Sequence, residues 1–359
     1  MKRVVIRKPG DYRQLVIEEH PDPLPAPDEV LIEVQAAGVN FADCITRMGL
    51  YSSARHYQGY PITPGFEAAG IVRSTGSHVT HIQPEMPVLA ISRFNAQATH
   101  LIVPGNQVFP LPATLTPVQA AALPAAALTA WFALFELAHV QTGNTLLVHS
   151  AAGGVGSMLV QMGKRAGCRV IAVVGASHKV EHAQQLGADV VIDKSQQDLW
   201  FEVKRIAPQG YDVVLDANGI TTLKHSYAHL APVGKLVVYG FHSMLSTRKG
   251  KPGKLGLLWD YLRTPRFSPF DLTTRNRSVL GFNLSYLFDK NEVLQRGMKE
   301  ILEWVESGDI HLPTITRYKL EAVADAHRDL ETGQTTGKLV LVTGEYPGNA
   351  HIPGSGGNG

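Results

Sequence analysis

The stretch that decides the fold is Thr145-Leu146-Leu147-Val148-His149-Ser150-Ala151-Ala152-Gly153-Gly154-Val155-Gly156. An apolar, β-prone run ends in a turn of small residues, and 157–166 is compatible with a helix. A strand, a tight turn and a helix in this order are the context that a dinucleotide-binding fingerprint requires. Gly153 would let the backbone approach a pyrophosphate, and Gly156 would let the helix pack close to the strand. Because Ala151 stands at the first glycine position of the usual pattern, an ordinary strand–helix turn is the alternative.

Further strands downstream place this turn in a larger sheet. Five β-branched runs follow, at 169–174, 190–193, 211–216, 235–239 and 278–282. Helical stretches such as 179–186 lie between several of them, and this alternation predicts a doubly wound parallel sheet in an α/β domain. The N–H groups of Gly153, Gly154, Val155 and Gly156 would then hold phosphates at the positive end of a helix dipole.

The residues after the second of these strands bear on the choice of cofactor. A carboxylate there selects NAD by bonding the ribose 2′-OH, but this chain has Val174-Gly175-Ala176-Ser177-His178-Lys179. No acid in this stretch would repel a 2′-phosphate, and Ser177 and Lys179 could donate to one. The sequence therefore predicts NADPH, with Gly175, Ser177 and Lys179 in its site. A solvated lysine of a first helical turn is the ordinary alternative for Lys179.

Composition limits the class of protein. The 359 residues suffice for two domains, and 44% hydrophobic with 18% charged residues is typical of globular proteins. A net charge of +2 gives no case for nucleic-acid binding. Two cysteines, Cys44 and Cys168, form no disulfide framework and favour a reducing compartment. With no signal peptide and no window apolar enough to span a membrane, we expect a cytoplasmic protein.

Four segments follow one another along the chain. Residues 1–115 are β-rich, with short strands separated by proline and glycine, and suggest a partly closed barrel. The nucleotide-binding domain is predicted at 116–285. Residues 286–343, with an amphipathic helix at 291–307 and a strand at 337–342, are predicted to return to the first domain. Residues 344–359 are rich in glycine, proline, asparagine and serine and predict a flexible tail.

Several motifs resemble those of one family. They are AGVNFAD at 37–43, RMGLY at 47–51, PGFEAAGIV at 64–72, LP at 123–124, LTAW at 128–131, HSAAGGVG at 149–156 and GFNL at 281–284. In order and spacing they resemble the zinc-free quinone oxidoreductases of the medium-chain dehydrogenase/reductase superfamily. The last motif and the long segment before it resemble most the vesicle amine transport protein family. The resemblance implies a GroES-like β-rich catalytic domain at both chain ends and a Rossmann NADP-binding domain between them.

The resemblance implies roles for four residues. Asn40 would lie at the nicotinamide and donate its side-chain amide to a carbonyl, and Tyr51 would line the acceptor pocket. Asp43 would orient the loop, and Thr129 would meet the nicotinamide amide. A turn residue, a packed loop aromatic and a helical core position are the structural alternatives for Asn40, Tyr51 and Thr129.

Other cofactor contacts are expected beyond the carboxyl ends of the strands, where ligands of such sheets bind. The candidates are Asn218, Gly240, Phe241, His242, Phe282 and Asn283. Lys194 stands where quinone oxidoreductases can have a tyrosine near the adenosine phosphate, and it supplies a positive charge instead. Lys338 is a further candidate.

The sequence predicts no metal. In zinc-dependent relatives a cysteine stands at the position of Asn40 and a histidine at that of Phe66, and 85–103 contains no cysteine. His78, His81 and His100 lack ligand spacing and are expected to be solvated. Cys44 is expected to be a small buried residue without nearby partners.

Without a metal to stabilise an alkoxide, alcohol oxidation is disfavoured. Direct hydride transfer from NADPH to a quinone or an α,β-unsaturated carbonyl, bound between the two domains, is the predicted reaction. The alternative is a low-turnover NADPH-binding adaptor for a lipid or protein partner. Residues 243–276 mix basic and aromatic side chains and predict a solvated loop and helix, or else a lid or a surface for anionic lipids. Edge strands near 235–239 and 278–282 predict a homodimer.

Overall fold

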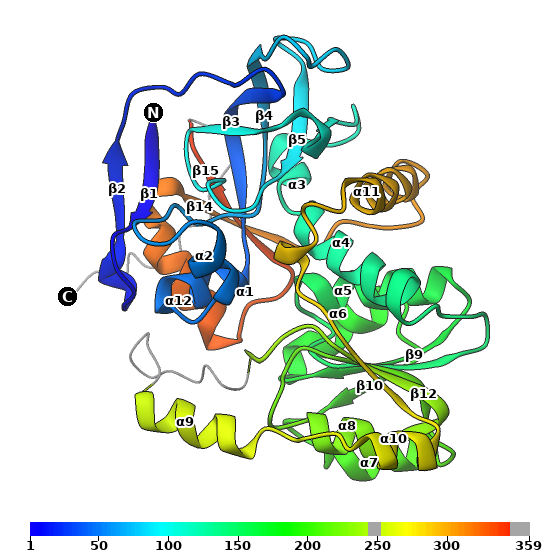
Figure 1. The fold of residues 1–359 in the computed structure, drawn as a ribbon. Coiled ribbons are helices and arrows are strands. Elements are labelled where there is room, and N and C mark those ends of the chain that lie inside the picture. The colour runs from blue at the N-terminus through cyan, green and yellow to red at the C-terminus, as the bar shows by residue number, and fades with distance from the viewer. Residues whose placement is uncertain (243–252, 345–359) are drawn as a thin grey trace, which may run out of the picture. The chain divides into compact units, whose positions relative to one another are not determined.

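The structure is a computed structural model, which describes residues 1–242 and 253–344 (Figure 1). The chain divides into two compact units. The terminal unit comprises Met1–Ala125, Phe288–Arg296 and Thr314–Gly359, and the central unit comprises Ala126–Leu287 and Gly297–Pro313. Two helices, α4 (Pro124–Trp131) and α11 (Asn291–Glu306), contain residues of both units.

The central unit is built on a parallel sheet of six strands. These are β8 (Thr145–Val148), β9 (Arg169–Val174), β10 (Val190–Asp193), β11 (Tyr211–Asp216), β12 (Leu230–Val238) and β13 (Ser278–Gly281). Their order is β10-β9-β8-β11-β12-β13, and every neighbouring pair is parallel. This is the order of a doubly wound dinucleotide-binding fold, so the prediction of a Rossmann domain is confirmed.

Helices cover both faces of this sheet. They are α5 (Gly154–Arg165), α6 (Val180–Gln185), α7 (Leu199–Ile206) and α8 (Leu223–Ala228). Two further helices, α9 (Lys254–Arg263) and α10 (Pro269–Arg275), precede β13. In Figure 1, α5 and α6 lie on one face and α7 and α8 on the other. Because both faces are covered, the strands are apolar almost throughout, as in Leu146, Leu147 and Val148, each fully buried.

One strand begins earlier than the sequence predicts. β12 starts at Leu230 rather than at 235. Its first half was not predicted because it contains Pro232 and Gly234, which are uncommon within strands. The register against β11 shifts between Tyr211 and Val213, and an irregularity of this kind lets a strand accommodate proline.

The terminal unit contains the other sheets. A hairpin joins β1 (Lys2–Ile6) to β2 (Leu15–Glu19), and the large sheet comprises β3 (Glu29–Val39), β4 (Glu67–Thr75), β5 (Pro87–Ile91), β6 (His100–Pro104), β7 (Val108–Pro110), β14 (Ile315–Lys319) and β15 (Lys338–Val342). The order is β14-β15-β3-β4-β5-β7, with β6 paired to β3. The late strands β14 and β15 thus join the sheet of the first hundred residues, and the predicted GroES-like fold is confirmed.

Four helices lie wholly in the terminal unit. They are α1 (Phe41–Met48), α2 (Ser52–Tyr57), α3 (Pro117–Ala120) and α12 (Val323–Thr332). α1 follows β3 directly, and α12 precedes β15, so both helices bring side chains toward the ends of these two strands.

One helical stretch is more apolar than the sequence analysis allowed. Among the described residues, 117–137 is long and apolar enough to cross a membrane, with a mean hydropathy of 1.6. The expectation that no segment is long and apolar enough to span a membrane is therefore wrong. Within the protein, 78% of this window is buried, as is typical of a helix in a protein core.

Candidate functional site

Three neighbouring strands bring Asn40, Glu67 and Lys338 to one point of the terminal unit. β3 lies between β15 and β4, with Val39 opposite Leu339 and Ala37 opposite Ala68. Glu67 and Lys338 are the first residues of their strands, and Asn40 directly follows β3. The antiparallel register alone therefore places these three residues beside one another.

A buried ion pair holds the Asn40 side chain. Lys338 Nζ lies 2.6 Å from Glu67 Oε1, and the two side chains are 4% and 0% exposed. Asn40 Nδ2 donates to Glu67 Oε1 at 2.8 Å, and Lys338 Nζ donates to Asn40 Oδ1. The other oxygen of Glu67 accepts from the backbone N–H of Ala125 at 2.7 Å. Each end of the Asn40 amide thus faces a charged partner of the matching kind.

A glycine in β3 makes room for this ion pair. A Cβ at Gly38 would lie 2.2 Å from Glu67 Oε1 and 2.5 Å from the carbonyl oxygen of Ala121. No side chain fits at this position while Glu67 keeps its place. No turn or positive φ requires glycine at position 38. The requirement for glycine comes from the close packing of Glu67.

The side chain of Asp43 binds the backbone of the turn that contains Asn40. Its Oδ2 accepts from the backbone N–H of Asn40 at 2.8 Å, and its Oδ1 accepts from that of Gly65 at 2.8 Å. Complete burial raises the pKa of Asp43 to about 7, although these N–H donors and Lys338 oppose the shift. The Asp43 carboxyl group thus joins the backbone of Asn40 to that of Gly65.

The stability of the wild-type protein, relative to an Asp43→Asn variant, should fall as pH rises from 5 to 8. The pKa of Asp43 is about 7 in the folded chain against an ordinary 3.8. The protonated Asp43 side chain therefore contributes its full stabilisation below the pKa of the unfolded chain. This contribution is lost as pH rises through the pKa of the folded chain. Two pH units correspond to a relative change on the order of 3 kcal/mol. Urea unfolding of both proteins at several pH values measures the difference, and a difference that does not change with pH would contradict the prediction.

Tyr51 lies in an aromatic cluster. Its ring meets Phe66 edge-on at 5.8 Å between centroids and Phe94 at 6.3 Å, and these two phenylalanines lie 5.1 Å apart. Phe66 and Phe94 are buried, whereas Tyr51 is half-buried. Phe66 precedes Glu67, so the aromatic cluster and the Asn40 cluster adjoin along the chain.

The central unit contains the predicted phosphate-binding turn. Gly153 caps α5 without a side-chain hydrogen bond, so the first N–H groups of Gly154, Val155 and Gly156 have no side-chain cap. A Cβ at Gly156 would lie 2.2 Å from the carbonyl oxygen of Ser150, which explains why this position is glycine. The turn therefore has the close approach between helix and strand that a pyrophosphate site needs.

Lys179, Lys194 and His242 lie close enough to one another to interact electrostatically. Lys179 is 8% exposed, and its pKa is lowered by burial and by the charge of Lys194. The surrounding protein, followed by Lys194 and Lys179, lowers the pKa of His242. A Cβ at Gly175 would be 3.5 Å from Cε of Lys194, so Gly175 leaves space beside that lysine. Like charges gathered in this way favour an anion.

Ser177 contacts an acid that the sequence analysis did not consider. Its hydroxyl donates to Oδ2 of Asp193 at 2.6 Å, and Asp193 also accepts from the hydroxyl and N–H of Ser195. Asp193 ends β10, the strand beside β9, so the missing acid at the end of β9 does not leave the region free of carboxylates. The two positive charges of Lys179 and Lys194 outnumber the single negative charge of Asp193.

The remaining candidates lie at the ends of the strands. Asn218 accepts from the Ser150 hydroxyl at 2.9 Å, and Phe241 follows Gly240 with 44% of its surface exposed. Phe282 packs on Phe132 at 4.9 Å, and Asn283 accepts from the N–H and hydroxyl of Ser285. Thr129 is half-buried in α4. Phe241 is thus available to a ligand, whereas Asn283 caps its own turn.

One group of possible metal ligands lies in the terminal unit. Cys44, His327 and Glu331 have donor atoms within 4.8 Å of one another, the one such group among residues 1–242 and 253–344. The expectation that Cys44 has no nearby partners is therefore wrong. Arg47 forms an ion pair with Oε1 of Glu331, and the Tyr12 hydroxyl donates to Oε2 at 2.6 Å. Both carboxylate oxygens are taken, and a buried arginine beside them opposes a dication.

Protonation also disfavours a metal in this group. Burial raises the pKa of the Cys44 thiol well above its usual value, so the thiolate ligand is not preformed. Burial and the charge of Arg47 lower the pKa of His327 to about 3, so its ring is neutral. Cys44, His327 and Glu331 thus form a buried polar contact between α1 and α12, and they do not suit a zinc ion.

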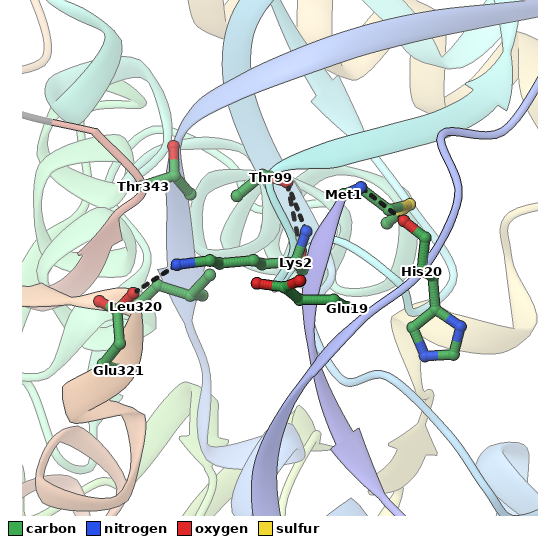
Figure 2. A pocket seen from close by; sticks show the side chains of 8 residues that line it. All are labelled: Met1, Lys2, Glu19, His20, Thr99, Leu320, Glu321 and Thr343. Atoms are coloured by element: carbon green, nitrogen blue, oxygen red, sulfur yellow. Dashed lines mark hydrogen bonds and ion pairs between the residues drawn. The ribbon is translucent and has the colours of Figure 1, made fainter.

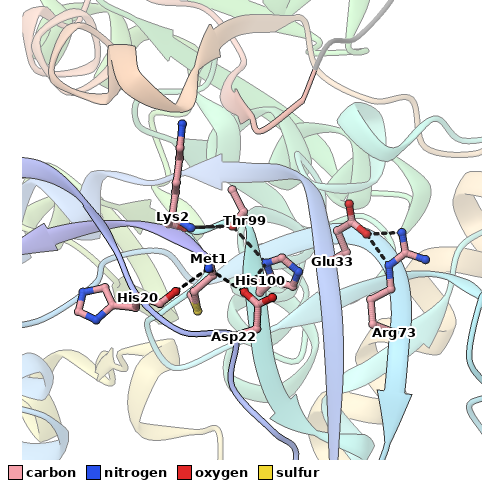
Figure 3. A network of polar contacts seen from close by, with 8 residues as sticks. All are labelled: Met1, Lys2, His20, Asp22, Glu33, Arg73, Thr99 and His100. Carbon is pink, nitrogen blue, oxygen red and sulfur yellow. Dashed lines mark hydrogen bonds and ion pairs between the residues drawn. The ribbon is translucent and has the colours of Figure 1, made fainter.

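The three other histidines considered for zinc lie on the surface of the terminal unit or near it. His78 and His81 are exposed, and His100 is half-buried, 3.2 Å from the Thr99 hydroxyl and 3.8 Å from Asp22 (Figure 3). Asp22 also accepts from the amino group of Met1 in the same network. These contacts join strands and do not form a ligand set.

A cavity of about 440 Å³ lies elsewhere in the terminal unit (Figure 2). Its lining residues are Met1, Lys2, Glu19, His20, Thr99, Leu320, Glu321 and Thr343. Lys2 pairs with Glu321 at 3.9 Å, and the cavity shares no residue with the Asn40 cluster. The cavity is therefore separate from the candidate site.

Comparison with known proteins assigns the chain to a family. The model of the alcohol dehydrogenase GroES-like domain matches 26–113, and that of the zinc-binding dehydrogenase matches 186–341. The synaptic vesicle membrane protein VAT-1 homolog of Rattus norvegicus is 32% identical over 344 residues, which are 93% of this chain and 82% of that protein. The chain belongs to the VAT-1 homologue family. The Danio rerio member is also 32% identical, and the match spans 88% of this chain but only 64% of that relative.

Solved structures relate this VAT-1 family chain to reductases of the medium-chain dehydrogenase/reductase superfamily. The Escherichia coli quinone oxidoreductase, crystallised with NADPH, is similar with a TM-score of 0.83 and 28% identity, over 96% of this chain and 100% of that one. The CurK enoyl reductase has a TM-score of 0.80 and 25% identity, over 95% and 98% of the two chains. The predicted family and its quinone oxidoreductase neighbours are thus confirmed.

Proposed function

We propose that this protein is a zinc-independent, NADPH-dependent reductase of quinones or α,β-unsaturated carbonyls. The observation that carries the proposal is the Asn40 amide, a neutral hydrogen-bond donor held by buried charges at the position where zinc-dependent relatives have a ligand. The two neighbouring lysines, Lys179 and Lys194, support NADPH over NADH, and related structures contain NADPH.

NADPH, when bound, supplies a hydride. The turn at Gly153–Gly156 would hold its pyrophosphate, and Lys179 with Lys194 would bind its 2′-phosphate. Asn40 would donate to the acceptor oxygen as negative charge develops there, and a proton from water completes the reduction. The ring of Tyr51, packed against the buried Phe66 and Phe94, would provide an aromatic surface for a planar acceptor.

A panel of quinones and enones, mixed with NADPH and followed by loss of reduced-cofactor absorbance, tests the proposal. The proposal predicts turnover of at least one class, with deuterium transferred from labelled NADPH to the product. Asn40→Ala should lower turnover and leave NADPH binding nearly unchanged. No oxidation of NADPH by any acceptor would refute the reductase function.

Exposed hydrophobic side chains favour the second candidate, an NADPH-binding adaptor with little turnover. Leu258, Trp259, Tyr261 and Leu262 on α9 are 56–69% exposed, and Phe270 on α10 is 85% exposed. Exposed apolar groups of this kind are typical of interaction surfaces. The adaptor becomes the better interpretation if NADPH binds tightly and no acceptor reacts. A cytoplasmic location stays a prediction beside relatives named as vesicle membrane proteins.

Protein purified without added metal should contain no stoichiometric zinc. Asn40 and Phe66 cannot serve as zinc ligands, and both oxygens of Glu331 already have partners. Elemental analysis measures the metal content, and activity should survive a chelator. One tightly held zinc per chain would contradict the ligand argument.

The protein should form a homodimer through β13. This strand is the edge of the central sheet, and its residues are exposed or half-buried. An open edge of this kind favours pairing with a second copy, and two-fold symmetry would continue the sheet. Light scattering during size exclusion measures the mass, and a monomer at working concentration would exclude the dimer.

A further inference from the structure

We propose that Glu67 and Lys338 are positioning residues, which fix the Asn40 amide in the one orientation that presents an N–H donor to an acceptor carbonyl. This inference rests on the proposed function, because it assigns those residues a task in that reaction. An amide can turn by half a rotation and exchange its donor and acceptor ends. Asn40 at this position is useful to a reductase only if its NH₂ group, and not its oxygen, faces the ligand.

The chemistry of the two partners decides the orientation. An ammonium group only donates hydrogen bonds, and a carboxylate only accepts them. Lys338 donates to Oδ1 of Asn40, and Glu67 accepts one hydrogen of Nδ2 at 2.8 Å. Turning the amide would set its NH₂ group against the ammonium and its oxygen against the carboxylate. The second hydrogen of Nδ2 is left for a ligand.

The partners are themselves held in place. Glu67 accepts from the Ala125 N–H at 2.7 Å, and Lys338 donates to the carbonyl of Val39 at 3.3 Å. Both charged side chains are almost completely buried, where charge–dipole interactions are stronger than in water. The ion pair is thus a fixed frame around an amide that is itself only half-buried.

A double-mutant cycle on turnover tests the inference. Lys338→Met and Glu67→Gln should each lower kcat by about 10- to 100-fold, as expected when a donor is misplaced. The dissociation constant of NADPH should change by less than about twofold, because the residues proposed to bind its phosphates lie in the central unit. In an Asn40→Ala background, the same substitutions should cost less than about threefold, since their effect passes through Asn40. Losses that multiply, or a Lys338→Met protein with wild-type kcat, would overturn the proposal.

The side-chain amide of Asn40 gives a readout that needs no turnover. In protein labelled with ¹⁵N-asparagine, the signal absent from Asn40→Ala identifies this group. We expect the two N–H resonances of this group to be displaced by the Glu67 carboxylate in the wild type, and to move toward the positions of an exposed asparagine in Lys338→Met. If no acceptor reacts with the wild type, the proposed function fails while this measurement still tests the orientation. An unchanged amide signal in Lys338→Met would refute the positioning role itself.

Gly38→Ala offers an independent perturbation of the same frame. Its Cβ would lie 2.2 Å from Glu67 Oε1 and 2.6 Å from Cδ, so the carboxylate must move. The variant should lose turnover and shift the Asn40 amide signal as Glu67→Gln does. Gly344→Ala is the matched control, because nothing lies within 4 Å of a Cβ there. Normal turnover in a folded Gly38→Ala protein would count against the proposal.

Discussion

Replacing Arg47 with methionine should lower the free energy of unfolding by about 3–5 kcal/mol. Arg47 is fully buried, pairs with Glu331 of α12, donates to the carbonyl of Gly10 at 3.3 Å and lies 4.3 Å above the ring of Tyr12. Without it, the buried Glu331 carboxylate keeps the hydrogen bond from the Tyr12 hydroxyl but loses its cationic partner. The cost is that of an uncompensated charge, and α1, which follows Asn40, would lose one of its contacts with α12.

The measurement must report on the terminal unit. All four tryptophans, Trp131, Trp200, Trp259 and Trp304, belong to the central unit, so their fluorescence follows the wrong part of the chain. Hydrogen exchange of peptides from α1 and α12 under native conditions measures local opening directly. Removing both charges, in Arg47→Met with Glu331→Leu, should restore much of the stability. Arg205→Met, in an exposed pair with Glu202, is the control and should cost less than about 1 kcal/mol. An Arg47→Met loss as small as the control's would refute the prediction.

The parallel sheet could be predicted because its signal is local. The strands at 169–174, 190–193 and 211–216 are mostly apolar and β-branched over a few consecutive residues, as expected for strands covered on both faces. The terminal unit was harder, because its short strands alternate with polar residues. β14 contains Arg317 and Lys319, and β7 has three residues, so neither shows a clear pattern.

The site was only partly predictable for a different reason. Asn40 and Asp43 lie in one motif, but Lys338 joins them through pairing across almost three hundred residues. Glu67 stands at the start of an apolar strand, and an unexplained acid in such a run was the available signal for its buried role. Asp193 reaches Ser177 only because β9 and β10 are neighbours. Local motifs identify the participants on one segment, whereas strand order decides which segments meet.

Substituting methionine for Lys179 should weaken NADPH binding by about 10- to 100-fold and change NADH binding by less than about twofold. The two cofactors differ only in the 2′-phosphate, and a charge-assisted hydrogen bond to a buried group contributes about 1.5–3 kcal/mol. Methionine keeps the apolar stem that Lys179 buries, so packing is largely preserved. Titration of both cofactors at low salt measures the effect. Lys224→Met, at an exposed lysine of the same unit, is the control and should leave both affinities unchanged.

Proton uptake distinguishes a phosphate site from a merely basic surface. The pKa of His242 is lowered by the surrounding protein and by Lys194 and Lys179, so the ring is largely neutral near pH 7. A 2′-phosphate beside the three groups would offset the two lysine charges and raise that pKa, so NADPH should bind with uptake of protons and NADH without it. Calorimetry in buffers of different ionisation enthalpy measures the number of protons. If NADH binds as tightly as NADPH, or if Lys179→Met weakens both cofactors alike, then Lys179 does not select the 2′-phosphate, and the prediction is wrong.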